Sequence, residues 1–361
     1  MIITMRYIGN KENLTDFIYE TLKDNGVEGE SLFDFFSGTA SVAKFFKEKG
    51  FKIYSSDIMY FSHVLQEAYI KNNGYPEFKK LLNKITVIPT TLIYKNYDLV
   101  LTYLNNLKGK KGFIYQNYSP GGTKELDKPR MYLSDENAMK IDAIRSTIEE
   151  WKKEELINHN EYYVLLATLL ESVSFYTNVA GVYAAFSKKW DPRALKPFEM
   201  RSISLIEGNQ QHEVFCADSM ELLDKVEADI IYLDPPYNQR QYAPNYHLLE
   251  TIAKYDSPDI YGVAGLRPYD EQKSTFCNAV TALRDLEIIA KEGNYKYLVL
   301  SYNNEGIMQE EDIKEVLSKY GDLKLIEKTY GRFKSHSRTK NAAKKVREQL
   351  YILKNSYIRE F

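Results

Sequence analysis

The chain has 361 residues, and its 44% hydrophobic and 27% charged residues are typical of a globular protein with an ample core, which excludes a disordered chain. The formal net charge of −2 excludes a uniformly cationic nucleic-acid binder, so contact with nucleic acid would require local basic patches. The two cysteines, Cys216 and Cys277, form neither a disulfide framework nor a zinc spacing, and no apolar run suits a signal peptide or a membrane span, so we expect a cytoplasmic protein without membrane contact.

The first part of the chain predicts the first half of an α/β sheet. Residues 11–24 place apolar side chains at helical spacing. The apolar run 31–36 ends in a small-residue turn, an amphipathic helix follows it, and residues 51–57 then form a second strand that ends at Asp57. Strand, glycine turn, helix and strand in this order are typical of a doubly wound sheet.

The pattern changes between residues 74 and 211. Residues 108–133 are rich in Gly, Pro and Lys and predict a long loop. Residues 134–157 predict a long helix with Ser134 as its N-cap, and residues 161–181 predict a second, buried helix. We therefore expect a mainly helical insertion at 74–211 that carries the target-recognition elements.

A sheet pattern resumes after the insertion. The most apolar strand, residues 228–233, ends directly before Asp234. The sequence thus predicts a Rossmann-like, doubly wound α/β sheet built from residues 1–73 and 212–361. The other strands expected in the second part are residues 212–218, 295–304, 323–333 and 348–355.

The strongest chemical signal is Asp234-Pro235-Pro236-Tyr237 at the carboxyl end of that apolar strand, where open α/β sheets bind ligands. Two prolines fix the backbone and remove two N–H donors, so nearby carbonyls can face a pocket. Asp234 and the Pro235 carbonyl could each accept one hydrogen of an adenine amine, and the Tyr237 ring could stack on an extruded base. An ordinary proline-rich turn is the structural alternative, but the four residues together with the apolar strand favour the chemical role.

A second signal is the turn formed by residues 34–40, DFFSGTA. Small residues between a strand and a helix let a cofactor approach the backbone closely, although ordinary strand–helix turns share this composition. Asp57 ends the next strand, where an acid can either accept the hydroxyls of a ribose or cap a helix. The residues alone do not choose between these two roles of Asp57.

The order of these motifs, with FSGTA early and DPPY late, resembles the alpha-ordered adenine amino-methyltransferases of restriction–modification systems, the Dam-like and FokI-methylase-like group. Residues 6–11 (RYIGNK) resemble the group's N-terminal cofactor motif, and residues 238–250 (NQRQYAPNYHLLE) resemble the stretch after its catalytic motif. Ala40 departs from the pattern, since the group often has a second glycine there. The resemblance implies a site-specific DNA adenine N6-methyltransferase that uses S-adenosylmethionine without a metal and acts on double-stranded DNA, with a cognate restriction endonuclease as partner.

The resemblance also implies roles for individual residues. Asp218 corresponds to the acid that contacts the adenine amine of the cofactor, although from its position it is equally suited to cap the helical turn that follows. The methyl group is expected to pass directly to the amine, without a covalent enzyme intermediate. The implied catalytic residues are Asp234, Pro235, Pro236 and Tyr237, and the implied cofactor-binding residues are Tyr7, Lys11, Asp34, Phe36, Gly38, Asp57 and Asp218.

Two clusters of basic residues predict contact with DNA. Residues 328–347 contain eight cations and no acid, with aromatic residues interleaved, which favours contact with phosphates over a merely solvated loop. A second, more mixed cluster lies in the loop 108–133, where the resemblance places target recognition. The residues proposed for the first cluster are Lys334, Arg338 and Lys340, and those for the second are Lys124 and Arg130.

Two other functions remain open on the sequence. A methyltransferase of the same fold could act on RNA or on a glutamine side chain, although such enzymes more often begin the motif with Asn and lack so long an insertion. A non-catalytic DNA-binding module is the other alternative, and the intact Asp234 and Tyr237 count against it.

Overall fold

The computed structural model describes residues 5, 7, 9–87, 95–331 and 345–356. It divides into two compact units. The sheet unit comprises Gly9–Gln66, Gln210–Tyr242 and the described chain from Glu271 onward, and the helical unit comprises Glu67–Asn209 and Ala243–Asp270, together with Met5 and Tyr7. The helical unit therefore begins close to the expected insertion but also takes in Ala243–Asp270, which comes after the Asp234–Tyr237 motif in the chain.

The strands of the sheet are β1 (Ser31–Asp34), β2 (Lys52–Asp57), β3 (Glu213–Cys216), β4 (Glu227–Leu233), β5 (Asn294–Asn303), β6 (Gly321–Gly331) and β7 (Lys345–Asn355). In the described chain they form one seven-stranded sheet in the order β3-β2-β1-β4-β5-β7-β6. β1 pairs in parallel with β2 on one side and with β4 on the other, so the strand order reverses between β1 and β4. The β5–β7 and β7–β6 pairs are antiparallel. The predicted Rossmann-like α/β sheet is confirmed.

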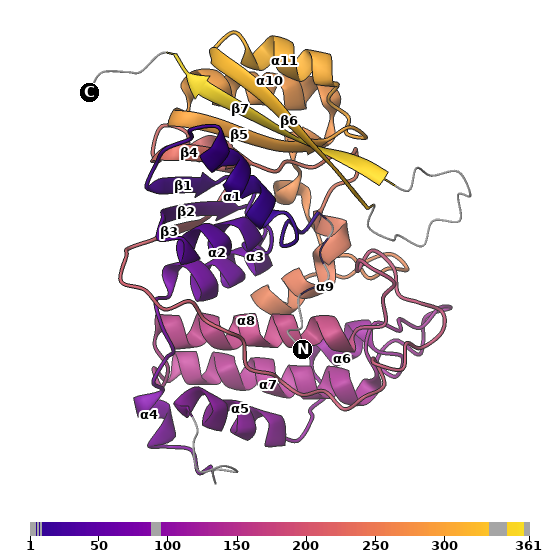
Figure 1. The fold of residues 1–361 in the computed structure, drawn as a ribbon. Coiled ribbons are helices and arrows are strands. Elements are labelled where there is room, and N and C mark those ends of the chain that lie inside the picture. The colour runs from indigo at the N-terminus through magenta and orange to yellow at the C-terminus, as the bar shows by residue number, and fades with distance from the viewer. Residues whose placement is uncertain (1–4, 6, 8, 88–94, 332–344, 357–361) are drawn as a thin grey trace. The chain divides into compact units, whose positions relative to one another are not determined.

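Helices lie on both faces of this sheet (Figure 1): α1 (Thr15–Asp24), α2 (Ser41–Glu48), α3 (Tyr60–Gln66), α10 (Ala279–Glu292) and α11 (Glu310–Leu317). Phe33, Ile231 and Leu298 stand side by side on three neighbouring strands. Because alternate side chains of a strand point to the same face, these three join one core cluster with residues of α10 and α11. The apolar runs of the sequence thus become strands covered on both faces. Short helical segments are η1 (Glu67–Lys71), η2 (Ser219–Leu222), η3 (Asp270–Gln272) and η4 (Thr275–Cys277).

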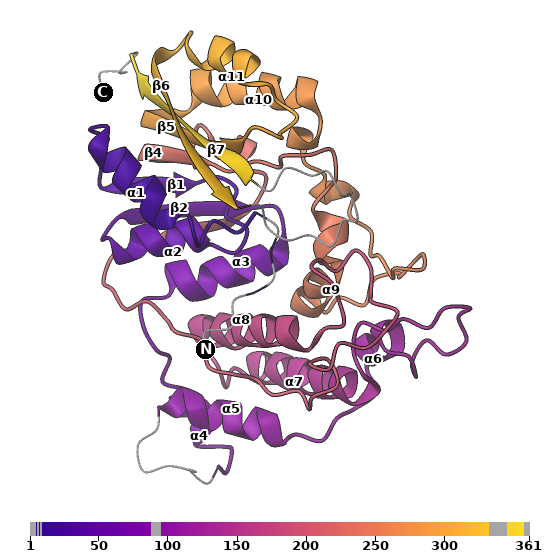
Figure 2. The same ribbon diagram turned by 45° about the vertical axis from the view of Figure 1, so that its right-hand side comes forward.

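The helices of the helical unit are α4 (Lys79–Leu82), α5 (Asn96–Asn106), α6 (Phe113–Tyr118), α7 (Asp135–Lys153), α8 (His159–Tyr176) and α9 (Ala243–Lys254). The two longest, α7 and α8, lie side by side (Figure 2). Ser134 caps α7 as predicted, since its hydroxyl accepts the Asn137 amide hydrogen at 3.2 Å. The prediction of a loop over residues 108–133 is wrong in part, because this segment contains α6. The amides of Gly112, Ile114 and Tyr115 at the start of α6 all donate to the distant carboxylate of Asp142, at 2.8–3.0 Å.

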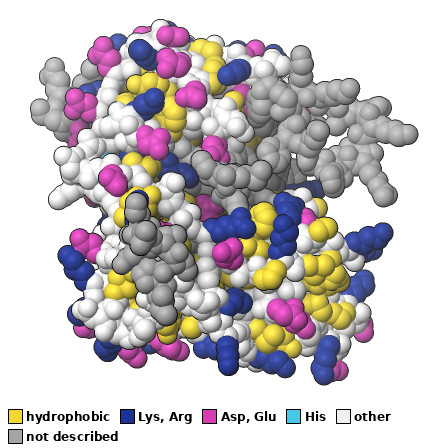
Figure 3. All heavy atoms as spheres, turned by 60° about the horizontal axis from the view of Figure 1, so that its bottom comes forward, with side chains coloured by type: hydrophobic (Ala, Val, Ile, Leu, Met, Phe, Trp, Pro, Cys, Tyr) yellow, Lys and Arg dark blue, Asp and Glu magenta, His cyan; other side chains and the backbone are white. Residues whose placement is uncertain are grey.

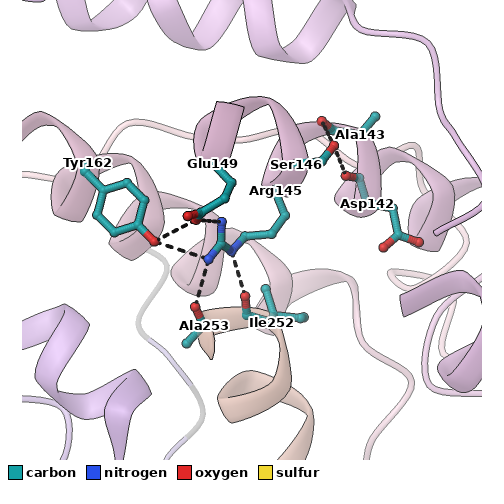
Figure 4. Close-up of polar contacts among 8 residues, drawn as sticks. All are labelled: Asp142, Ala143, Arg145, Ser146, Glu149, Tyr162, Ile252 and Ala253. Carbon is teal, nitrogen blue, oxygen red and sulfur yellow. Dashed lines mark hydrogen bonds and ion pairs between the residues drawn. The ribbon is translucent and has the colours of Figure 1, made fainter. Parts of the chain in front are cut away.

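Arg145 explains why α9 belongs to the helical unit. This arginine of α7 is 1% exposed, and its guanidinium donates to the carbonyls of Ile252 at 2.9 Å and Ala253 at 3.1 Å, near the C-terminal end of α9 (Figure 4). Glu149 accepts from the same guanidinium at 2.8 Å and from the Tyr162 hydroxyl of α8 at 3.0 Å. A cation is favoured at a helix C-terminus, where carbonyls lack partners within the helix. Arg145, Glu149 and Tyr162, with the two carbonyls of α9, form a hydrogen-bonded cluster that we call the Arg145 clasp. The clasp joins α7, α8 and α9.

Within the described ranges, no helix combines the length and apolarity needed to cross a bilayer. The same residues contain no cluster of three or more His, Cys, Asp or Glu side chains arranged to bind a metal ion. On the face shown in Figure 3, Lys and Arg side chains lie among hydrophobic and acidic ones.

Candidate active site at the carboxyl ends of β1 and β4

Two aspartates stand where the strand order of the sheet reverses. Asp34 is the last residue of β1, and Asp234 directly follows β4. The two strands are parallel neighbours, with Asp34 in register with Tyr232. Open α/β sheets bind ligands outside the carboxyl ends of their strands at such a reversal. The fold therefore brings the early and the late sequence motif to one edge of the sheet.

The side chain of Asp234 is held through one of its two oxygens. Oδ1 accepts a hydrogen bond from the Tyr237 hydroxyl and lies 3.4 Å from the ammonium nitrogen of Lys11. Both groups approach Oδ1, and the side chain keeps 15% of its surface exposed. Among the residues that the structure describes, Oδ2 accepts no hydrogen bond, so its acceptor capacity is unused there.

Burial raises the pKa of Asp234 to about 6, while the nearby Lys11 ammonium opposes the rise. Glu348 adds to the rise by charge repulsion, and the Tyr237 hydrogen bond opposes it. Most of the carboxylate is still ionised at neutral pH. At neutral pH both oxygens therefore act as acceptors, whereas protonation in acid turns one of them into an O–H donor and removes the negative charge.

Lys11 connects Asp234 to a second buried acid, Glu348 of β7. Lys11 is 4% exposed and Glu348 is 1% exposed. The ammonium donates to Glu348 Oε1, which also accepts from the Ser301 hydroxyl of β5 at 2.6 Å. Lys11 also lies 4.9 Å from the ring centre of Tyr237. The sequence motifs did not predict Glu348 or Ser301, because 337 positions separate Lys11 from Glu348 and no local pattern links them.

The turn after β1 is joined to the end of β2 by Asp57. One oxygen of this carboxylate accepts the Gly38 amide hydrogen at 2.8 Å, and the other accepts that of Met59 at 2.8 Å. Gly38 and Ala40 both have left-handed backbones, with φ of 53° and 57°. Glycine adopts this conformation without strain, which accounts for a second glycine being suited to position 40. The bond to Met59 forms a turn just before α3, and both roles of Asp57, at the cofactor and as a helix cap, stay predictions.

Asp34 is a buried acid beside this turn. Its carboxylate accepts a hydrogen bond from the Ser37 hydroxyl at 3.1 Å. Burial raises the pKa of Asp34 to about 7; the Ser37 bond opposes this rise, and the charges of Asp234 and Asp57 add to it. A positively charged ligand would favour the ionised form of Asp34.

The remaining predicted cofactor residues lie in different surroundings. Phe36 packs edge-on against Phe276, with ring centres 5.0 Å apart. Asp218 is exposed and caps η2, accepting the Met220 amide hydrogen at 3.0 Å, as its position allowed. Tyr7 belongs to the helical unit, where its ring stacks on Tyr246 at 4.6 Å.

A family model described as D12 class N6 adenine-specific DNA methyltransferase matches residues 7–316. The chain belongs to this family. The resemblance drawn from the motifs is thereby confirmed, as is the link to restriction–modification methylases. Among relatives, the Type II methyltransferase M.NlaIII of Neisseria lactamica is 38% identical over 361 residues, covering 98% of this chain and 100% of the relative.

Two longer relatives match with similar identity. The Type II methyltransferase M.FokI of Planomicrobium okeanokoites is 38% identical over 353 residues, covering 97% of this chain and 52% of the relative. The modification methylase StsI of Streptococcus sanguinis is 37% identical over 358 residues, again covering 97% and 52%. The D12-class chain thus spans about half the length of these two relatives.

The Asp234–Tyr237 motif of this D12-class chain is firmly packed. Pro235 and Pro236 are buried. The ring of Tyr237 meets that of Tyr302 edge-on at 5.4 Å, and its carbonyl accepts the Ile307 amide hydrogen at 3.0 Å. Since Lys11 lies over the Tyr237 ring, a base would have to stack on the opposite face.

The predicted DNA-contacting residues fall into three situations. Lys124 is 74% exposed beside Glu125. Arg130 is 5% exposed, and its guanidinium donates to the carbonyls of Asn117 at 3.0 Å, Gly262 at 2.9 Å and Val263 at 3.4 Å. Arg130 therefore braces its own unit, whereas the sequence predicted that it reads a base edge. The other predicted residues, Lys334, Arg338 and Lys340, lie outside the described residues.

Proposed function

We propose that the chain is a site-specific DNA adenine N6-methyltransferase that transfers the methyl group of S-adenosylmethionine to the exocyclic amine of an adenine in duplex DNA. The observation that carries this proposal is the way in which the Asp234 carboxylate is held at the carboxyl end of β4. Its Oδ1 is occupied by Tyr237 and Lys11, which leaves Oδ2 for an amine at the strand-order reversal of a D12-class fold.

The proposed chemistry depends on how these residues orient the amine. When bound, the cofactor supplies a methyl group on a positively charged sulfur. Oδ2 of Asp234 accepts one hydrogen of the amine and the Pro235 carbonyl accepts the other, which directs the nitrogen lone pair away from the base ring. The Tyr237 ring supports the extruded base by stacking. The protein contributes chiefly positioning and electrostatic stabilisation.

The acids around the turn after β1 fit the cofactor. Each oxygen of Asp57 uses one acceptor site on a backbone amide, and a carboxylate oxygen has a second site for a ribose hydroxyl. The exposed Asp218 can accept from the adenine amine of the cofactor. The negative charges of Asp34 and Asp57 favour a cationic ligand. The remaining residues proposed to hold the cofactor are Tyr7, Lys11, Phe36 and Gly38.

A methyl-transfer assay tests this function directly. Purified chain is incubated with tritiated S-adenosylmethionine and with duplex DNA, duplex RNA or a protein extract as acceptor. We expect label in DNA alone, and nuclease digestion should release it as N6-methyladenine. Label in RNA or in protein glutamine, or DNA binding without any transfer, would favour one of the two alternatives left open by the sequence.

We further propose that the helical unit carries the target-reading surface. The exposed Lys124 lies in a loop whose end is fixed by Arg130 to the turn Tyr261–Leu266. Tyr261 and Val263 of that turn are exposed. Arg130 thus acts by holding two loops together, and the loops present a cation and apolar side chains that could meet a groove.

A salt series on cognate and mismatched duplexes distinguishes reading from positioning. Neutralising Lys334, Arg338 and Lys340 to Gln should weaken binding to both duplexes, and the slope of log affinity against log salt should become shallower by about one unit per lost phosphate contact. Lys124→Gln should instead reduce the ratio of the two affinities. Fluorescence anisotropy supplies both quantities. A Lys124 variant that weakens both duplexes equally would place this residue on phosphates.

The biological setting is proposed from the relatives. Their names identify them as modification or Type II methyltransferases. We propose that this chain likewise protects DNA in the cytoplasm against a cognate restriction endonuclease.

A further inference from the structure

Glu348 is a buried acid that no sequence motif assigns to the active site. It stands on β7, is 1% exposed, and accepts from Ser301 of β5 as well as from Lys11. Burying an ionised side chain has a desolvation cost that its partner often only offsets, and apolar replacement of a buried pair often leaves a fold as stable or more stable. The position of Glu348, one ammonium away from Asp234, points to a role beyond stability.

The Lys11 ammonium lies between the carboxylates of Glu348 and Asp234 and is closer to that of Glu348. It contacts Glu348 closely, while its distance to Asp234 Oδ1 is 3.4 Å. Glu348 therefore draws the ammonium toward β7. On the Asp234 side the ammonium lies 3.4 Å from Oδ1, the same oxygen that Tyr237 contacts.

We propose that Glu348 is a positioning residue for methyl transfer: it keeps the Lys11 ammonium on the Oδ1 side of Asp234, so that Oδ2 stays available to the substrate amine. This inference rests on the proposed function. Without the charge of Glu348, Asp234 is the acid that remains beside the ammonium among the described residues, and the ammonium moves onto it. There it competes with the substrate amine for the same carboxylate.

The electrostatic consequence has a definite sign. Glu348 raises the pKa of Asp234, and Lys11 lowers it. Removing the charge of Glu348 ends the repulsion and brings Lys11 closer, and both changes lower the pKa of Asp234 from about 6. The titratable groups that interact with Asp234 are Lys11 from the N-terminal segment, Asp34 of β1, Tyr232 of β4, Tyr237 and Tyr242 after β4, and Glu348 of β7.

The test compares Glu348→Gln with the wild type in single-turnover methyl transfer to duplex DNA from pH 5 to pH 8.5. Gln keeps the size of the side chain and can still pair with Ser301. We expect the plateau rate to fall about tenfold, the effect of weakening one hydrogen bond to a charged group. The acid limb of the profile should move down by about half a pH unit or more. The KM for DNA, measured separately at steady state, should stay close to wild type.

A matched control comes from the next residue of β7. Gln349 is also buried, but it points to the other face of the sheet, where it donates to Glu310 at 2.7 Å and Glu327 at 3.0 Å. Gln349→Met should leave the acid limb in place. Ser301→Ala removes the 2.6 Å bond to Glu348 and should move the limb in the same direction as Glu348→Gln, by less. This second variant carries the test if Glu348→Gln fails to fold.

Two results would overturn the proposal. In the first, the acid limb of the pH–rate profile stays in place in both Glu348→Gln and Ser301→Ala. In the second, Gln349→Met moves that limb as far as Glu348→Gln does. A carbon-13 titration of labelled aspartate carboxyls, assigned with Asp234→Asn, measures the ionisation of Asp234 without turnover. If the wild type transfers no methyl group, the proposed function fails. The titration then still shows whether Glu348 controls Asp234, so the two failures can be distinguished.

Discussion

Asp234→Asn should reduce methyl transfer by roughly 10²–10⁴-fold, the range for losing a group that acts on the reacting atoms. Asn can offer one acceptor oxygen, but it carries no charge, and its amide nitrogen would face either Tyr237 or the substrate amine as a donor. Cofactor affinity should remain within about tenfold, since only one nearby charge is lost. Single-turnover transfer and calorimetric titration of the cofactor measure the two effects separately.

The same variant should be at least as stable as the wild type at pH 8. The pKa of Asp234 is raised from 3.8 to about 6 in the folded chain, so folding favours its protonated form. The corresponding stability is fully present below pH 3.8 and is lost as pH rises through about 6. Asn removes the buried charge and should recover up to about 3 kcal/mol at high pH.

For the wild type, the transfer rate should rise with pH through about 6 as Asp234 ionises.

Two further variants separate the contributions within this site. Tyr237→Phe keeps a stacking ring but loses the hydroxyl that contacts Asp234, so we expect about a tenfold loss, between wild type and Asp234→Asn. Asp229→Asn is a control on the same strand as the site, because Asp229 of β4 accepts the amide hydrogens of Glu30 and Ser31 at the start of β1. It should keep near-normal transfer. Full activity in Asp234→Asn would remove this residue from the mechanism.

The sequence predicted those features that depend on neighbouring residues. Apolar runs predicted the strands, and they placed Asp234 at the carboxyl end of a strand, where the structure has it. Ser134 was likewise predicted as the cap of α7. Local patterns suffice here, since hydrophobic periodicity and capping act within a few residues.

Features that depend on distant contacts were not predicted. The loop 108–133 contains α6 because Asp142, far along the chain, accepts its first amides. Lys11 was expected at the cofactor, and its partner Glu348 could only be found once β7 was placed beside β5. Arg130 looked like an exposed cation in a basic loop, but the carbonyls that bury it come from residues 262 and 263. Charge alone does not distinguish a surface cation from a buried one.

The second large effect is expected from Arg145→Met, which should destabilise the helical unit by about 3–5 kcal/mol. Met fills much of the space, yet the carbonyls of Ile252 and Ala253 and the Tyr162 hydroxyl lose their charged donor. Buried acceptors without a donor keep their full desolvation cost. The loss should therefore exceed that of a surface ion pair such as Lys110–Glu150, whose nitrogen and oxygen are 4.0 Å apart.

Urea unfolding followed by tryptophan fluorescence measures the free energy of unfolding of the helical unit. Both tryptophans, Trp151 and Trp190, belong to the helical unit, so their emission reports on it alone. Lys110→Met should change the free energy of unfolding by less than about 1 kcal/mol. Hydrogen exchange should show the amides of α9 opening first in Arg145→Met, because the clasp holds that helix by its C-terminal carbonyls. An unchanged urea midpoint would mean that apolar packing alone holds α9 against α7 and α8.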